Sequence, residues 1–123
     1  MNRVALVIGN SEYLNIGKLN NPKNDANDIA SILGKLNFDV EKVIDADLLD
    51  IQRSVNKFLQ ALDEYAVGLF FYAGHGMQID GKNYIVPVDL KLGDKSMRMI
   101  LRIFTISNVC HMWMPTINTT YPL

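Results

Sequence analysis

A histidine held between two glycines is the clearest candidate for chemistry in this 123-residue chain. Gly74, His75 and Gly76 follow an apolar run at residues 69–72, so the sequence predicts an exposed imidazole at the end of a buried strand. Because glycine has no Cβ, such neighbours let the backbone turn sharply and can offer an amide N–H to a reacting oxygen. The alternative interpretation is a simple turn in which His75 has no chemical role.

Cys110 is the single cysteine, so its thiol cannot form an intrachain disulfide. A thiolate is a nucleophile, and a histidine within reach can take the thiol proton or lower the thiol pKa through an ion pair. We expect a further parallel strand within residues 99–109, ending at Cys110, which would bring the thiol to the sheet edge that carries His75. The alternative is a buried or tail cysteine without a catalytic role.

Alternating strand and helix patterns must position these residues. Continuous or alternating apolar runs predict the strands, and apolar residues at helical spacing predict the helices, with Asn21 and Asp47 as caps. The order indicates an α/β fold in which a mostly parallel sheet is flanked by helices and ligands bind at the carboxyl ends of the strands. The predicted strands are 4–8, 38–44 and 67–72, the predicted helices 22–36 and 48–62, and a short extended segment covers 84–87.

The composition excludes several classes of function. Twelve Lys and Arg against 13 Asp and Glu, with no block of like charge, argue against nucleic acid as a partner. The sequence has no glycine fingerprint for a nucleotide, and its two histidines, His75 and His111, lie far apart, so we predict no cofactor and no metal. No apolar run approaches the roughly 20 residues of a membrane-spanning helix. We therefore expect a cytoplasmic protein that does not bind a membrane.

Four segments together resemble the caspase-like cysteine peptidases, in the bacterial, paracaspase and metacaspase branch. They read RVALVIGN at 3–10, LNNPKNDA at 19–26, LFFYAGHGM at 69–77 and NYIVPVD at 83–89. The resemblance implies a three-layer caspase-haemoglobinase fold and hydrolysis of peptide bonds in a polypeptide substrate by a Cys–His dyad. It also implies a large-subunit (p20-like) domain at 1–110. The last residues have no periodicity, so we expect an irregular tail at 111–123. Some metacaspases require calcium, which nothing in this sequence indicates.

The resemblance assigns roles by position. His75 matches the catalytic histidine, the Gly76 amide matches an oxyanion-hole donor, and Asp25 matches an acidic residue of the S1 pocket that favours Arg or Lys before the cut. A carboxylate in a partly desolvated pocket does select a cation, and Arg can bind it with two hydrogen bonds. The alternative for Asp25 is a solvated residue in the first turn of a helix, near the positive end of the helix dipole.

The departure from the family lies at the nucleophile. In caspases the cysteine follows the histidine by about 50 residues, whereas Cys110 follows His75 by 35. Asn108 and His111 stand where an acidic residue and Arg are usual, and we expect an incomplete fold without the small-subunit region. A separate small-subunit region or a second copy of the chain would then be a partner. Two functions stay open: a cysteine endopeptidase, or an inactive caspase-like domain or fragment that acts at most as an interaction module.

Overall fold

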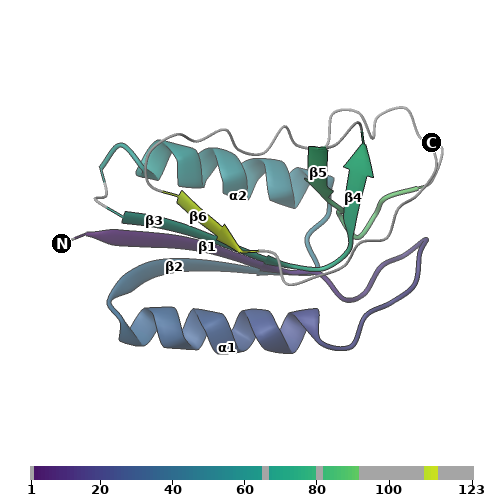
Figure 1. The fold of residues 1–123 in the computed structure, drawn as a ribbon, viewed down its shortest axis with the longest axis horizontal. Coiled ribbons are helices and arrows are strands. Elements are labelled where there is room, and N and C mark those ends of the chain that lie inside the picture. Colours follow the sequence, from purple (N-terminus) through teal and green to yellow (C-terminus); the bar gives the residue numbers. More distant parts are fainter. Residues whose placement is uncertain (1, 65–66, 80–81, 92–109, 114–123) are drawn as a thin grey trace.

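The computed structural model describes residues 2–64, 67–79, 82–91 and 110–113. Its first five elements follow the predicted order of strand, helix, strand, helix and strand, so the α/β class is confirmed (Figure 1). In chain order the elements are β1 (Arg3–Gly9), α1 (Pro22–Lys35), β2 (Phe38–Ile44), α2 (Leu48–Ala61), β3 (Val67–Ala73), β4 (Gly76–Ile79), β5 (Lys82–Ile85) and β6 (Cys110–Trp113).

A four-stranded parallel sheet forms the middle layer, with strand order β2-β1-β3-β6. Figure 1 shows α2 on one face of this sheet and α1 on the other. The predicted mostly parallel sheet flanked by helices is therefore confirmed. Within the described residues, no helix has the length and apolar character that crossing a bilayer requires.

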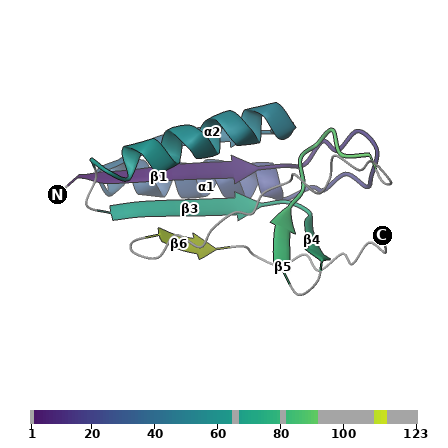
Figure 2. The same cartoon turned by 90° about the horizontal axis from the view of Figure 1, so that it is seen from above.

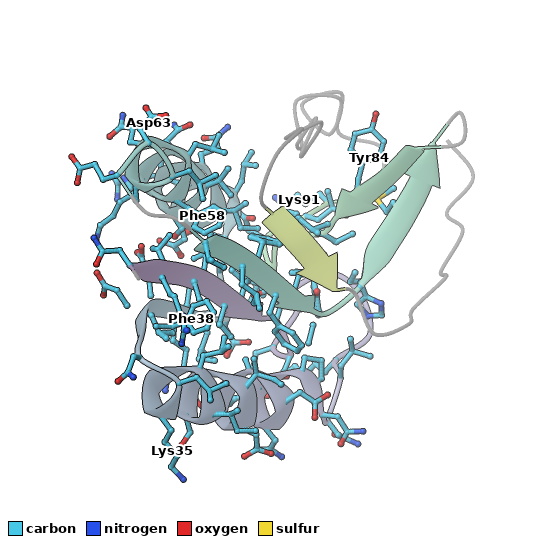
Figure 3. The ribbon with its side chains drawn as sticks, turned by 60° about the vertical axis from the view of Figure 1, so that its left-hand side comes forward. Lys35, Phe38, Phe58, Asp63, Tyr84 and Lys91 are labelled. Carbon is cyan, nitrogen blue, oxygen red and sulfur yellow. The ribbon has the colours of Figure 1, made fainter. Side chains whose placement is uncertain are left out.

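The central strand β1 is buried on both faces because its side chains alternate between two cores. One core joins alternate β1 residues to α2, and the other joins the intervening residues to α1. Figure 3 shows Phe58 and Phe38 in the layers between the sheet and these two helices. The first core includes Val4, Leu6, Ile8, Ile51, Val55 and Phe58, and the second includes Ala5, Val7, Ala26 and Leu33.

The two helices begin with different caps. At α2 the Asp47 carboxylate accepts from the Asp50 N–H at 2.8 Å, and the Asp50 carboxylate accepts from the Asp47 N–H at 3.2 Å, which is a capping box. The predicted cap of α2 is therefore confirmed. Asn21 occupies the cap position of α1, but its side chain makes no capping bond; the Ser11 hydroxyl instead accepts from the Lys23 N–H at 3.0 Å.

An antiparallel hairpin, β4–β5, follows β3 and pairs Gly76 with Ile85, whereas the sequence predicted only a short extended segment at 84–87. Figure 2 shows this hairpin beside the carboxyl end of β3. Each strand has only four residues, too few for a clear alternation of apolar and polar side chains. The Asp80-Gly81 dipeptide between the strands was the available signal, since it favours a two-residue hairpin turn.

Candidate active site

His75 follows the last residue of β3 by two positions, at the edge where the parallel strands end. Gly9, the last residue of β1, pairs there with Ala73, the last residue of β3. The Asn10 N–H donates to the Ala73 carbonyl at 2.8 Å, which ties the loop after β1 to the start of the histidine segment. The structure therefore has the predicted histidine at the carboxyl edge of the sheet.

The imidazole of His75 is buried, with only 7% of the residue exposed, so the expectation of an exposed ring is wrong. The loop after β1 covers it: the Tyr13 ring meets the imidazole at a centroid distance of 4.6 Å and an angle of 63°. The Gly17 carbonyl oxygen lies 2.7 Å from Nε2. The sequence did not reveal this cover, because residues 11–20 have no periodicity from which to predict a path.

The contact with Gly17 decides where the proton on the ring resides. A backbone carbonyl can only accept, so Nε2 must carry the proton and donate to it. In the neutral ring Nδ1 then has a lone pair, and this buried atom has no hydrogen-bond partner among the described residues. A buried polar atom without a partner is rare in folded proteins and marks a place where a further group belongs. Nδ1 is thus the atom that can take a proton.

The main chain of His75 is held at both ends. Its N–H donates to the Tyr13 hydroxyl at 2.8 Å. Its carbonyl accepts from the Tyr72 hydroxyl at 2.6 Å and from the Val86 N–H at 3.1 Å. From the sequence, Tyr72 was predicted only as part of an apolar strand and Tyr13 had no predicted role, because a phenol that packs as a hydrophobic residue carries no separate signal for its hydroxyl.

Asn10 joins three segments behind the histidine. Its side-chain NH₂ donates to the carbonyls of Ala46 and Val86 at 3.3 and 3.2 Å, and its side-chain oxygen accepts from the Ala46 N–H at 2.8 Å. Asn10 is fully buried, and a buried amide needs such partners. These bonds link the end of β1 to the segments that follow β2 and β5.

Gly76 is the first residue of β4, directly after His75. Its place in the hairpin register sets the course of the backbone beside the imidazole. Its role as a donor to an oxyanion stays a prediction.

Asp25 lies in the first turn of α1 and is exposed. This turn starts close to the end of β1: a Cβ built on Gly9 would lie 2.6 Å from the Pro22 carbonyl oxygen and 2.6 Å from the Ala26 Cβ. Asp25 therefore belongs to the same edge of the fold as His75. Both interpretations of its carboxylate, a substrate pocket or a solvated first turn, agree with this position.

Cys110 is not brought to His75. The strand predicted within residues 99–109 lies outside the described residues, and the described strand β6 begins at Cys110. Cys110 pairs with Gly68, near the amino end of β3. The five residue steps from Gly68 to Ala73, the end of β3, span roughly 17 Å, and His75 lies beyond that end. Apolar residues also follow Cys110, so hydrophobicity alone could not fix where the strand starts.

A metal site and a cavity away from His75 are two other kinds of candidate site. In the described part of the chain, no three His, Cys, Asp or Glu side chains are grouped to hold a metal ion. A cavity of about 390 Å³ lies between α2 and the first half of β1, with Glu41, Lys57 and Phe58 in its lining. The cavity does not include His75 and so is separate from the candidate active site.

The comparisons with known proteins agree with the fold. The family model described as "Caspase domain" matches residues 2–112. The human mucosa-associated lymphoid tissue lymphoma translocation protein 1 is 38% identical over 87 residues, which are 71% of this chain and 11% of that protein. Its mouse homologue is 38% identical over 87 residues, 71% of this chain and 10% of the relative. The chain thus spans about a tenth of the length of these curated relatives.

Proposed function

Since the chain belongs to the caspase domain family, we propose that His75 is the proton-transfer group of a caspase-like cysteine peptidase. The observation that carries this proposal is the state of the imidazole: Nε2 is bound to the Gly17 carbonyl, while Nδ1 is buried without a partner among the described residues. A ring fixed in this way has one nitrogen ready to accept a proton, as general base catalysis requires. Because Nδ1 is covered, substrate must uncover it on binding.

The proposed reaction has two stages: the thiol is acylated with release of the amine, and the thioester is then hydrolysed. A thiol gives its proton to Nδ1 as its sulfur attacks the carbonyl carbon of the scissile bond, and the Gly76 N–H stabilises the oxyanion. The imidazolium then gives that proton to the leaving amine as the C–N bond breaks, which leaves a thioester. Nδ1 then deprotonates a water molecule, whose oxygen attacks the thioester carbonyl carbon. As the C–S bond breaks, the imidazolium gives that proton to the sulfur, which releases the carboxylic acid and restores the thiol.

The thiol in this proposal comes from polypeptide other than residues 1–123. Cys110, the single cysteine of the chain, pairs with Gly68 at the other end of β3. In the described sheet β6 is an outer strand, which offers an edge for more strands. We infer that a small-subunit region, which supplies this thiol, continues the sheet at this edge.

The substrate of this site is a polypeptide cut after Arg or Lys. Support comes from the exposed carboxylate of Asp25, which lies in the first turn of α1 at the sheet edge that carries His75. An arginine guanidinium can bind such a carboxylate with two parallel hydrogen bonds. An uncharged side chain at the same place in the substrate gains nothing from it.

A small thiol supplied in solution tests the role of His75. We expect thiol-dependent hydrolysis of an arginine ester by the wild-type chain, and a rate lower by about 100-fold in His75→Ala, since positioned general bases contribute at least that much. His111→Ala is the matched control, because His111 is the other histidine of the chain. Thiol-dependent hydrolysis that survives His75→Ala would contradict the proposal, and hydrolysis that requires Cys110 would contradict the external thiol.

A caspase-like domain that binds partners without cleaving them is the second candidate, and the distance between Cys110 and His75 favours it. The thiol-dependent ester hydrolysis described above separates the two, because an interaction module should show none. An electrophilic peptide probe ending in Arg tests in addition whether Cys110 and His75 meet. An interaction module should be labelled at Cys110 slowly and equally in the wild type and in His75→Ala. Labelling that needs His75 would show that the thiol and the imidazole meet, which would rule out this candidate.

A further inference from the structure

We propose that Tyr13 and Tyr72 are positioning residues that close a hydrogen-bonded ring on the main chain of His75. The ring starts at the His75 N–H, which donates to the Tyr13 hydroxyl at 2.8 Å. The Tyr13 and Tyr72 hydroxyls lie 3.1 Å apart, and the Tyr72 hydroxyl donates to the His75 carbonyl at 2.6 Å. The ring therefore ends on the residue where it began. Its catalytic importance rests on the proposed function, but its existence does not.

The direction of the ring follows from counting protons, since each phenol has one proton to donate. The shortest acceptor contact of Tyr72 is the His75 carbonyl, so its proton points there and its oxygen is left to accept. Tyr13 already accepts from the His75 N–H and can donate to Tyr72. The Val86 carbonyl, 3.2 Å from both hydroxyls, is the longer alternative acceptor. Bonds in one direction around a ring strengthen each other in a low-dielectric interior.

Both phenols stay protonated in this environment. Burial raises the pKa of Tyr13 to about 12, and it raises the pKa of Tyr72 well above its ordinary value. Each residue is only 1% exposed. A tyrosinate has no proton to donate, so the ring remains intact throughout the neutral range.

Gly74 supports the same inference independently. A Cβ at this position would lie 2.5 Å from the Tyr72 hydroxyl oxygen and 2.6 Å from that of Tyr13. The two hydroxyls therefore occupy the space that a side chain would fill. The sequence suggested that this glycine leaves room beside the imidazole, and the structure shows that the tyrosine hydroxyls use the room.

The consequence for the imidazole is a fixed orientation before any thiol or substrate arrives. With the main chain of His75 held at both ends, the ring edge of Tyr13 and the Gly17 carbonyl need only set the side-chain torsions. Catalytic groups that are already oriented avoid an entropic loss when the reaction starts. The two tyrosines differ, because the His75 carbonyl keeps the Val86 N–H without Tyr72, whereas the His75 N–H has no second acceptor among its described contacts.

Nitrogen-15 NMR of the two imidazoles tests the proposal without substrate, thiol or activity, with His111→Gln used for assignment. In the wild type His75 should show one neutral tautomer with a slowly exchanging Nε2 proton. In Tyr13→Phe we expect that proton to exchange with water about tenfold faster, because loss of one hydrogen bond loosens the residue. Tyr72→Phe should show a smaller change in the same direction, and Tyr84→Phe, from the hairpin, should show none.

This test can fail or succeed independently of the proposed function, since the hydrogen-bonded ring can orient the imidazole whether or not the imidazole catalyses hydrolysis. Thermal unfolding of each variant checks that it is folded when its spectrum is recorded. If Tyr13→Phe does not fold, the Nε2 exchange rate in Tyr72→Phe is the test. An unchanged Nε2 exchange rate and tautomer in folded Tyr13→Phe, or in Tyr72→Phe as the deciding variant, would overturn the proposal. An equal change in Tyr84→Phe would overturn it as well.

Discussion

At the scale of single residues, the contacts of His75 determine which way a proton can move. The Gly17 carbonyl holds the proton on Nε2, and Nδ1 is left as the acceptor. The hydroxyls of Tyr13 and Tyr72 hold the main chain of the same residue. Gly74 is required because its two neighbours in space are these hydroxyls. These four residues together orient the His75 imidazole.

Gly74→Ala should lower the free energy of unfolding by about 1 to 3 kcal/mol, the usual effect of an added methyl group in a filled interior. Gly34→Ala is the matched control, since a Cβ at Gly34 in α1 would meet nothing within 4 Å. Alanine has a higher helix propensity than glycine, so Gly34→Ala should raise the free energy of unfolding by about 0.5 to 1 kcal/mol. Urea unfolding of both variants measures the two changes in the free energy of unfolding. A Gly74→Ala variant that is stabilised as Gly34→Ala is would argue against the crowding at Gly74.

The buried phenol of Tyr13 should make unfolding easier at high pH. The folded protein keeps the proton of Tyr13 up to a pKa of about 12, whereas the unfolded chain loses it from 10.0. The contribution of the Tyr13 proton to the free energy of unfolding is therefore fully present below pH 10. It falls by about 1.4 kcal/mol per pH unit as the pH rises from 10 towards 12. Urea unfolding across this range should show a shallower decline in Tyr13→Phe and the wild-type decline in Tyr84→Phe. Equal declines in the wild type and Tyr13→Phe would count against it.

At the scale of elements, the sheet and helices form a platform, and the loop after β1 carries the site. The N–H groups of Ser11 and Glu12 donate to the Asp45 carboxylate at 2.9 and 3.0 Å. The Leu14 N–H donates to the Val88 carbonyl at 2.9 Å. These bonds tie the loop to the segments that follow β2 and β5. The loop can therefore hold Tyr13 and Gly17 against His75 although it has no regular structure.

The two helix starts should respond differently to loss of their polar side chains. Asp47→Ala removes the bond that the Asp47 carboxylate accepts from the Asp50 N–H in the capping box of α2, and it should lower the free energy of unfolding by about 0.5 to 2 kcal/mol. Asn21→Ala removes no capping bond at α1 and should change the free energy of unfolding by less than about 0.5 kcal/mol. Chemical denaturation of the two variants makes the comparison. An Asn21→Ala effect as large as that of Asp47→Ala would show that the side chain of Asn21 does cap α1.

At the scale of the whole molecule, periodicity predicted the platform because each of its elements buries one or two faces. The continuous apolar run of β1 and the apolar stripe of α2 follow directly from their positions in the layers. The position of His75 at the carboxyl edge followed from the same order of elements. The fold class and one site residue were therefore within reach of the sequence.

The cover over His75 and the place of Cys110 were not within reach. Tyr13 and Gly17 act through a loop whose path depends on single hydrogen bonds to distant segments, and no local pattern encodes these. The start of β6 depends on strand register, which apolar residues on both sides of Cys110 do not define. The residue chosen as nucleophile was consequently placed at the wrong end of the sheet.

Binding of a substrate peptide at His75 is tested most directly by titrating the chain with a short peptide ending in Arg while recording the His75 Nδ1 resonance. A saturable shift of that resonance is expected, because substrate must uncover Nδ1. Asp25→Asn should weaken the titration, and a matched peptide ending in Leu should not produce it. An Nδ1 resonance that stays unchanged at peptide concentrations that saturate binding elsewhere would contradict a peptidase site at His75.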